Sequence, residues 1–336
     1  MDKLTPPITQ LKLGLDTFSL RNQEWNLSQI LEYAHRNKLH ALQVGAHDLE
    51  SLDIHYLTKL KDAAARLNIT IEPGMGSIST LSSRWDTTYR SPHDYLLAAL
   101  ATSKALGAET CRVFLGNATD RKKGINVNQL VEGAINTLRS VRNQALDSGV
   151  KLAVENHGEI HSHHVKTIIE EAGREFVGFC FDAGNATVLA EDPLYVLESL
   201  SAYITTAHIR DSVVFAHPRG AAVQWVPLGE GNIDIRNLTT RFLQTCPTAH
   251  YHLEIITGRP PQVVPYLEPQ FWTVDSTMPV GCLAMFERRV RAGYPNLNAT
   301  LTTSGPPPDC FRSAMKHQDL QDIERSIEWV RQNFET

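Results

Sequence analysis

The chain has 336 residues, of which 42% are hydrophobic and 21% charged, and these proportions exclude a disordered or fibrous protein. Its 32 Lys and Arg residues stand against 37 Asp and Glu residues, and the resulting net charge of −5 argues against nucleic acid as a partner. The first ten residues lack a secretory-signal pattern and no run of 18 apolar residues occurs, so we expect a cytoplasmic protein without a membrane partner. The five cysteines have no CxxC spacing, which argues against a disulfide framework or a thiolate zinc site.

Short runs of β-branched and apolar residues recur along the chain, and each is followed by a turn and a stretch of helical periodicity. These runs predict eight strands: Leu11–Phe18, Ala41–Gly45, Ile69–Glu72, Thr110–Leu115, Lys151–Asn156, Val177–Asp182, Ile204–Ile209 and Tyr251–Ile256. Ser91 and Asp192 each precede a proline and predict helix starts, while Gly149 predicts the end of a long helix over Asn128–Ser148.

Strands that alternate with helices predict an α/β fold, and eight such units close most economically into a (β/α)8 TIM barrel, here a single domain over residues 1–336. A doubly wound open sheet is the alternative, but no GxGxxG follows the first strand. Residues 258–318 are rich in proline, with one evident helix near Cys282–Arg291, and we expect an irregular extension that forms a lid or an oligomer contact. A last amphipathic helix over Asp319–Asn333 would complete the outer ring.

Polar residues stand at the ends of four successive predicted strands. The active site of a TIM barrel lies at the carboxyl ends of its strands, where this chain places Glu155, Asp182, His208 and Glu254. Side chains alternate along a strand, and the bulky apolar neighbours of these residues take the opposite face. We therefore expect the four polar side chains to face the barrel axis.

Three carboxylates beside one imidazole need a compensating cation, because like charges at short range raise one another's pKa. A divalent metal ion meets this need. Oxygen-rich ligation with a single histidine suits Mn²⁺, Mg²⁺ or Co²⁺, with Zn²⁺ as a further option. The alternative is that the four are unrelated polar residues that hydrogen-bond to the backbone of nearby loops.

Five stretches match the pattern of a known family: VENHGE (Val154–Glu159), FDAGN (Phe181–Asn185), AHIRD (Ala207–Asp211), PLGEGNIDI (Pro227–Ile235) and HLEII (His252–Ile256). In their order and spacing the chain resembles the xylose-isomerase-like TIM-barrel superfamily, the sugar phosphate isomerase/epimerase group, over about residues 11–257. The resemblance implies one bound divalent metal ion. Its implied ligands are Glu155, Asp182, His208 and Glu254, and Glu155 and Glu254 are also the implied catalytic residues, on opposite sides of the substrate.

Six further residues are candidate substrate contacts: His157, Glu159, Asn185, Arg210, His217 and Arg259. His157 and Glu159 could position hydroxyl groups or relay protons. Arginines suit a carboxylate or phosphate group, since a guanidinium binds such anions in a bidentate manner. Sugar epimerases of the group often have histidine where Asn185 stands, which leaves the substrate open.

The leading hypothesis is an enzyme that isomerises or epimerises a small keto-sugar or sugar acid through a metal-stabilised ene-diolate. One alternative is a lyase of the same fold, which would decarboxylate or dehydrate an oxo sugar acid, because fold alone does not separate these reactions. Another is a sugar-binding barrel without enzymatic activity. The extension at 258–318 also favours a homo-oligomer.

Overall fold

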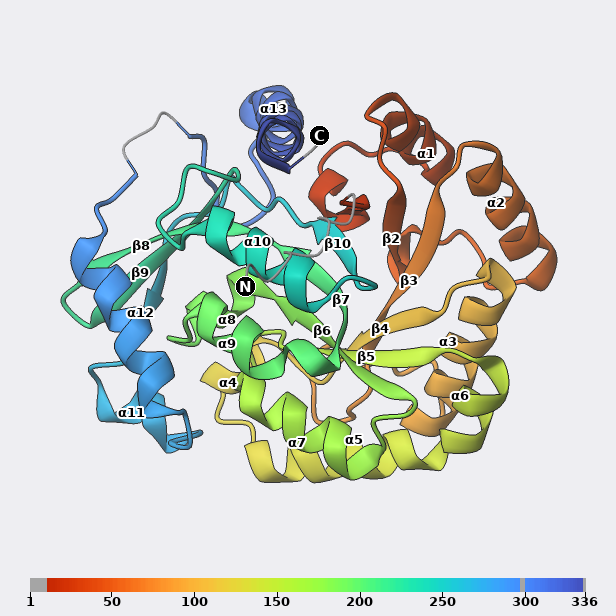
Figure 1. Ribbon diagram of the computed structural model, residues 1–336, viewed down its shortest axis with the longest axis horizontal. Coiled ribbons are helices and arrows are strands. Elements are labelled where there is room, and N and C mark those ends of the chain that lie inside the picture. Colours follow the sequence, from red (N-terminus) through yellow and green to blue (C-terminus); the bar gives the residue numbers. More distant parts are fainter. Residues whose placement is uncertain (1–10, 297–299, 335–336) are drawn as a thin grey trace, which may run out of the picture.

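The computed structural model describes residues 11–296 and 300–334. Eight parallel strands close into a barrel in the order β1-β2-β3-β4-β5-β6-β7-β10 (Figure 1). The barrel strands are β1 (Leu13–Asp16), β2 (Ala41–Gly45), β3 (Thr70–Ser77), β4 (Thr110–Phe114), β5 (Lys151–Glu155), β6 (Val177–Asp182), β7 (Ile204–Ile209) and β10 (His250–Leu253). Each coincides with a predicted strand, although β3 continues to Ser77 instead of ending at Glu72. The TIM barrel is thus confirmed, and the open-sheet alternative is wrong.

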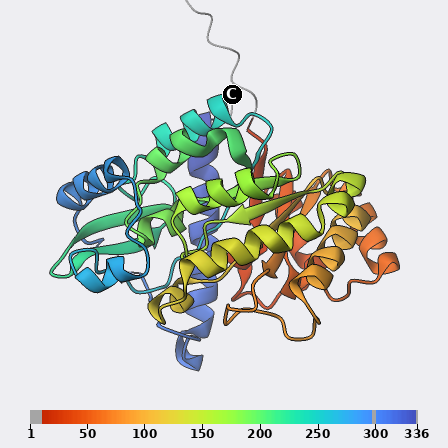
Figure 2. The same cartoon turned by 90° about the horizontal axis from the view of Figure 1, so that it is seen from below.

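Helices follow the strands and cover the outside of the barrel (Figures 1 and 2). They are α1 (Leu27–Arg36), α2 (Ile54–Arg66), α3 (Pro92–Leu106), α4 (Ala118–Lys122), α5 (Val127–Ser140), α6 (Arg142–Ser148), α7 (Ser162–Ala172), α8 (Ala183–Val188), α9 (Pro193–Leu200) and α10 (Ile235–Thr245), with short 3-10 helices η1 (Thr17–Leu20), η2 (Ala46–Asp48) and η3 (Ser201–Tyr203). The side chains of Ser91 and Asp192 cap α3 and α9 as expected.

The single long helix expected over Asn128–Ser148 is wrong, because two helices, α5 and α6, occupy this stretch. They meet at Val141, whose φ of −114° and ψ of 13° lie outside the helical region. The expected C-cap is present, since Gly149 ends α6 with a φ of 70°.

A small antiparallel sheet interrupts the barrel pattern between β7 and β10. Strands β8 (Asp211–His217) and β9 (Gly220–Val226) form a hairpin, and β11 (Gln262–Val264) adds to the edge of β9. This hairpin was not among the predicted elements. It projects from the barrel beside α12 (Val280–Ala292; Figure 1), so the chain between the last two barrel strands includes more than a helix. Gly229 and Gly231 follow the hairpin, and their N–H groups donate to Asp211 Oδ2 over 2.9 and 3.0 Å.

Segment 258–318, of which residues 297–299 lie outside the described part, is more regular than expected. It holds β11, α11 (Pro269–Thr273), α12 (Val280–Ala292) and the first turns of α13 (Asp309–Phe334). The helix near Cys282–Arg291 is confirmed as α12, and the last helix begins at Asp309 instead of Asp319. Figure 2 shows α13, in blue, lengthwise. It packs against η1 and thereby joins the outer ring.

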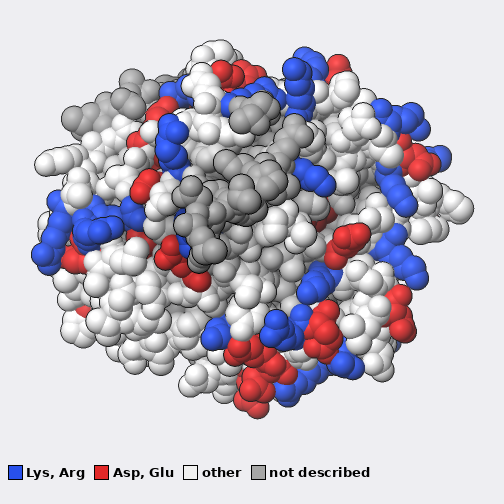
Figure 3. Space-filling model, in the orientation of Figure 1, with Lys and Arg blue, Asp and Glu red and all other residues white. Residues whose placement is uncertain are grey.

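The outer surface carries both signs of charge, and on the face shown in Figure 3 the Lys and Arg residues are interspersed with Asp and Glu. Among the described residues, no helix combines the length and the apolar character needed to cross a membrane. The inside of the barrel also holds polar side chains, since Asp16, Gln43, Glu72 and His252 are all buried there.

Candidate metal centre

Four side chains at the carboxyl ends of β5, β6, β7 and β10 converge inside the barrel. Glu155 and Asp182 are the last residues of β5 and β6, His208 is paired with Asp182 across β6 and β7, and Glu254 follows directly after β10. The Nδ1 atom of His208 lies 3.3 Å from Glu155 Oε1, 3.7 Å from Asp182 Oδ2 and 3.5 Å from Glu254 Oε2. The structure therefore brings together all four residues that the sequence places at strand ends.

The donor atoms of this cluster fit a cation. All four side chains are buried, and His208 Nδ1 has no hydrogen-bond partner. Buried polar atoms without partners are uncommon and often mark the place of an ion or water. One ligand atom from each residue lies within 4.8 Å of all the others. Three carboxylates and one imidazole could thus hold a divalent metal ion with oxygen-rich ligation.

Two arginines contact the acidic side chains of the cluster. Arg210 Nη2 lies 2.7 Å from Glu254 Oε2 and also bonds to Asp182 Oδ2. From β4, Arg112 Nε lies 3.4 Å from Glu155 Oε2. Arg210 was expected as a substrate contact, but its side chain is buried against two of the candidate ligands. Its guanidinium thus balances part of their negative charge.

Asn185 also connects two of the candidate ligands. At the first turns of α8, its Nδ2 donates to Glu155 Oε1 over 3.2 Å and to Asp182 Oδ2 over 2.8 Å. Its backbone N–H donates to Asp182 Oδ1 over 2.7 Å, so Asp182 also caps the helix. Asn185 therefore fixes the orientation of both carboxylates, and its role as a substrate contact stays a prediction.

The acidic groups around His208 favour the protonated, positively charged form of its ring. Burial alone would lower its pKa, but the neighbouring Cys180, Glu155 and Glu254 outweigh that effect and raise the pKa of His208 well above its usual value. On the other side of the ring, burial raises the pKa of Asp16 to about 7. A metal ion on Nδ1 would have to displace a proton from His208, so the affinity for metal should increase with pH.

Gln43 of β2 determines which nitrogen of His208 carries a proton. The Nε2 of Gln43 donates to Glu72 Oε1 over 2.7 Å, so its Oε1 is left to accept from His208 Nε2 over 2.6 Å. This bond keeps the proton on Nε2 and leaves Nδ1 facing the three carboxylates. Hydrogen bonds of this kind orient ligating histidines and increase their basicity.

We predict that Gln43→Leu lowers the affinity for Mn²⁺ by about 10–100-fold, the usual effect of losing such a partner. Gln43→Glu, which keeps an acceptor oxygen, should lose less of the affinity for Mn²⁺. Calorimetric titration of each chelator-treated variant with Mn²⁺ measures these affinities. An unchanged affinity in Gln43→Leu would show that this bond does not orient His208.

His157 and Glu159 lie in the loop after β5, beside β4. The His157 ring stacks on Phe114 with 4.3 Å between centroids, and its Nδ1 is 2.7 Å from the carbonyl oxygen of Gly116, to which it donates. Glu159 is fully buried, and its Oε1 accepts two backbone N–H groups over 3.1 Å, from Leu115 and Gly116. Its Oε2 has no partner. Both residues thus line the loop next to the cluster without joining it.

Burial raises the pKa of Glu159 to about 8, so the folded protein holds this carboxyl protonated at neutral pH. The unfolded chain releases that proton at about pH 4.3, so the group destabilises the fold increasingly as the pH rises from there to about 8. We predict that Glu159→Gln of the metal-free protein is more stable than the wild type at pH 8, by up to about 5 kcal/mol. Near pH 4 the two should be equal. Urea unfolding at both pH values tests this, and a pH-independent difference would contradict it.

Two other predicted contacts lie apart from the four candidate ligands. His217 ends β8 at the tip of the hairpin, where its Nδ1 accepts the N–H of Arg219 over 3.2 Å. Arg259 is exposed in the loop after β10, with its guanidinium 5.7 Å from the ring of Trp225 and 5.9 Å from that of Phe18. Arg259 thus belongs to the mouth of the barrel, while His217 has no contact with the four ligands.

Sequence reasoning missed three residues around His208: Asp16 and Gln43, which are buried, and Arg112, whose side chain is 12% exposed. Asp16 ends β1 and its Oδ2 lies 3.5 Å from His208 Nε2. The rule that was applied to strands five to eight, a polar residue at the carboxyl end, also fits Asp16. Gln43 and Arg112 stand within their strands, and a polar residue in a buried apolar strand was the one signal that could have marked them.

Together the closed barrel and the buried cluster define a TIM barrel with a candidate metal centre at the carboxyl ends of its strands. The family model described as "Xylose isomerase-like TIM barrel" matches residues 26–264. The chain belongs to this family.

Individual relatives are more distant. The curated relative "Uncharacterized protein YihM" of Escherichia coli (strain K12) is 25% identical over 206 residues, which span 61% of this chain and 57% of that protein. The match thus covers little more than half of the relative's length.

Solved structures share the fold at low identity. The IolI protein with a binding zinc atom superposes with a TM-score of 0.62 and 14% identity, over 97% of this chain and 100% of that one. D-Psicose 3-epimerase with D-tagatose from Clostridium cellulolyticum H10 superposes with a TM-score of 0.60 and 15% identity, over 83% of this chain and 96% of that one. The probable 3-DHS dehydratase AsbF from Bacillus anthracis superposes with a TM-score of 0.54 and 13% identity, over 72% of this chain and 92% of that one. The structural neighbours therefore include an epimerase and a dehydratase.

Proposed function

We propose that the protein is a divalent-metal-dependent enzyme that isomerises or epimerises a small keto-sugar or sugar acid. The metal would be Mn²⁺, Mg²⁺ or Co²⁺, with Zn²⁺ as a further option. The observation that carries the proposal is the convergence of Glu155, Asp182, His208 and Glu254, whose ligand atoms lie within 4.8 Å of one another, with the buried Nδ1 of His208 left without a hydrogen-bond partner. A fold shared with an epimerase and with a zinc-binding protein supports it.

A metal ion bound there would polarise the substrate's carbonyl and hydroxyl oxygens and so acidify the adjacent C–H bond. Of the two glutamates at the centre, Glu155 and Glu254, one would remove the proton while the other returns it. Asn185 holds Glu155 Oε1, so the carboxylate keeps its direction during the transfer. The Nε2 of His157 is left to bind a substrate hydroxyl, because its Nδ1 is held by Gly116.

Exchange of substrate hydrogen with solvent tests this proposal. Metal-loaded protein in D₂O, incubated with a panel of keto-sugars and sugar acids, should introduce deuterium at the carbon next to the carbonyl group of its substrate and leave the carbon count unchanged. Chelator-treated protein should not. If no member of the panel exchanges with Mn²⁺, Co²⁺, Mg²⁺ or Zn²⁺ present, the proposal fails for that class of substrate.

The second candidate is a lyase acting on an oxo sugar acid, and arginines at the barrel mouth favour it. Partial desolvation and the charges of Arg21 and Arg210 lower the pKa of Arg259 to about 10, so it remains cationic at neutral pH. Its guanidinium lies over the rings of Phe18 and Trp225. A cation at the barrel mouth, beside other arginines, suits a substrate carboxylate. Release of CO₂ or water would distinguish the lyase from the isomerase.

We predict that Arg259→Ala raises KM for a carboxylate substrate by about 10–100-fold, as expected for a lost hydrogen bond to a charged group. KM for a neutral keto-sugar should change little. Arg219→Ala is the matched control, because Arg219 is an exposed arginine that pairs with Glu268 in the hairpin region. Equal effects of the two variants on KM would remove Arg259 from the substrate site.

A further inference from the structure

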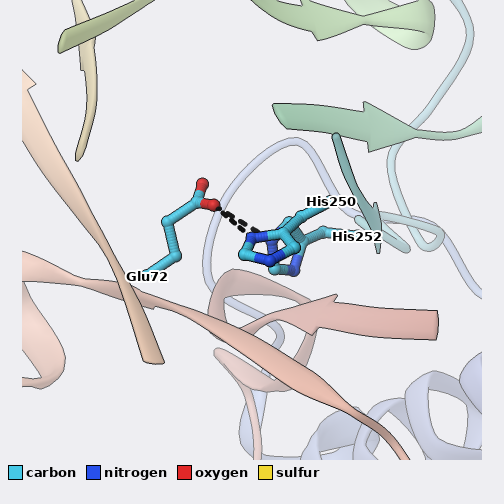
Figure 4. Close-up of side chains that lie close together, drawn as sticks. All are labelled: Glu72, His250 and His252. Carbon is cyan, nitrogen blue, oxygen red and sulfur yellow. Dashed lines mark hydrogen bonds and ion pairs between the residues drawn. The ribbon is translucent and has the colours of Figure 1, made fainter. Parts of the chain in front are cut away.

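A second group of potential ligands lies inside the barrel, away from the carboxyl ends of the strands. Glu72 is near the start of β3, His250 is the first residue of β10, and His252 follows two positions later on the same strand face. Figure 4 shows the carboxylate of Glu72 directed toward both imidazole rings. Glu72 Oε2 lies 2.7 Å from His250 Nδ1 and 3.7 Å from His252 Nε2.

His252 is fully buried, yet neither of its ring nitrogens has a hydrogen-bond partner. Its Nε2 faces Glu72 at a distance too long for a hydrogen bond. Gly14 on the neighbouring strand leaves space for the ring, because a Cβ there would lie 2.5 Å from His252 Nδ1. An imidazole accommodated in this way and left without a partner indicates a missing ligand.

Glu72 is oriented so that one oxygen remains available. Gln43 donates to its Oε1 over 2.7 Å, which turns Oε2 toward the two histidines. His250 opens the group to solvent, since 32% of its side chain is exposed. An ion could therefore reach the group from outside, and water could complete its coordination.

We propose that Glu72, His250 and His252 bind a second divalent metal ion, of the zinc class, that is separate from the ion of the candidate catalytic centre. Two imidazoles and one carboxylate are ligands that Zn²⁺ takes readily, with a water molecule as the fourth. Binding replaces the hydrogen bond between His250 and Glu72, and the proton of Nδ1 passes to solvent. The ion links β3 to β10 across β1 and β2, so it stabilises the closed barrel.

The two metal groups share no ligand. Gln43 lies between them, because its Oε1 accepts from His208 while its Nε2 donates to Glu72. Variants of one group therefore leave the ligands of the other in place, and the second site does not depend on the proposed reaction.

The test is a count of bound zinc. Full-length protein is stripped with a chelator, loaded with excess Zn²⁺, freed of unbound ion by gel filtration and measured by elemental analysis. His250→Ala and His208→Ala should each hold one ion fewer per chain than the wild type, and the double variant two fewer. His55→Ala, which removes an exposed histidine outside both groups, should hold as many ions as the wild type. Glu72→Gln, which keeps the shape of the side chain, should match His250→Ala.

A melting experiment separates loss of the ion from loss of the fold. Zn²⁺ should raise the melting temperature of His208→Ala, which keeps the second group alone, and leave that of the double variant unchanged. The proposal is overturned if the wild type holds no more than one ion, or if folded His250→Ala holds as many ions as the wild type.

Discussion

Glu155→Gln and Glu254→Gln are each expected to lower kcat by about 10²–10⁴-fold, the usual contribution of a general acid or base. Glutamine has nearly the size of glutamate, so it keeps the packing at these buried positions, but it cannot accept a proton. Both carboxylates have an oxygen within 3.5 Å of His208 Nδ1. Steady-state kinetics with the metal-loaded variants measures the loss.

The control for this prediction is Glu32→Gln, an exposed position on α1 away from the cluster, which should keep wild-type activity. Melting curves of all three variants show whether the fold survives. Full activity in both Glu155→Gln and Glu254→Gln would show that neither carboxylate moves a proton, and would favour a binding barrel over an enzyme.

His208→Ala is expected to weaken binding of the catalytic-centre metal by more than about 100-fold, the upper end of the effect of losing an outer hydrogen-bond partner. The imidazole is the sole nitrogen ligand of this centre, and its Nδ1 is central to the three carboxylates. Calorimetric titration with Mn²⁺ measures the change, since oxygen-rich ligation suits Mn²⁺.

The same titration has a pH dependence with a definite sign. The raised pKa of His208 means that the metal-free protein holds a proton there that the metal must displace. The wild-type affinity for Mn²⁺ should therefore increase with pH, and this increase should be smaller in His208→Ala. A variant that binds Mn²⁺ as tightly as the wild type at every pH would remove His208 from the centre.

The positions of Glu155, Asp182, His208 and Glu254 were predictable because each depends on local information. A strand of alternating side chains ends at each of them or one residue away, and parallel strands of a barrel bring their carboxyl ends to one place. The surroundings of His208 were not predictable in this way. Gln43 and Arg112 reach the cluster from β2 and β4, and their contacts depend on how the closed barrel places inward side chains across its interior.

The hairpin β8–β9 shows a second limit of sequence reasoning. Val213 and Val214 precede the turn at His217–Gly220, so a strand–turn–strand pattern was present. Eight strands already accounted for the barrel, and the chain gives no local sign that an antiparallel pair belongs outside it. His217, which was expected to contact the substrate, lies at the tip of this hairpin, and its position depends on the hairpin that was not predicted.

The central claim is most directly tested by anomalous diffraction from crystals of the protein soaked with Mn²⁺. The account predicts an anomalous peak within bonding distance of Glu155, Asp182, His208 and Glu254, and no peak at this place in crystals of His208→Ala. Wild-type crystals at saturating Mn²⁺ with no peak among these four side chains would contradict it.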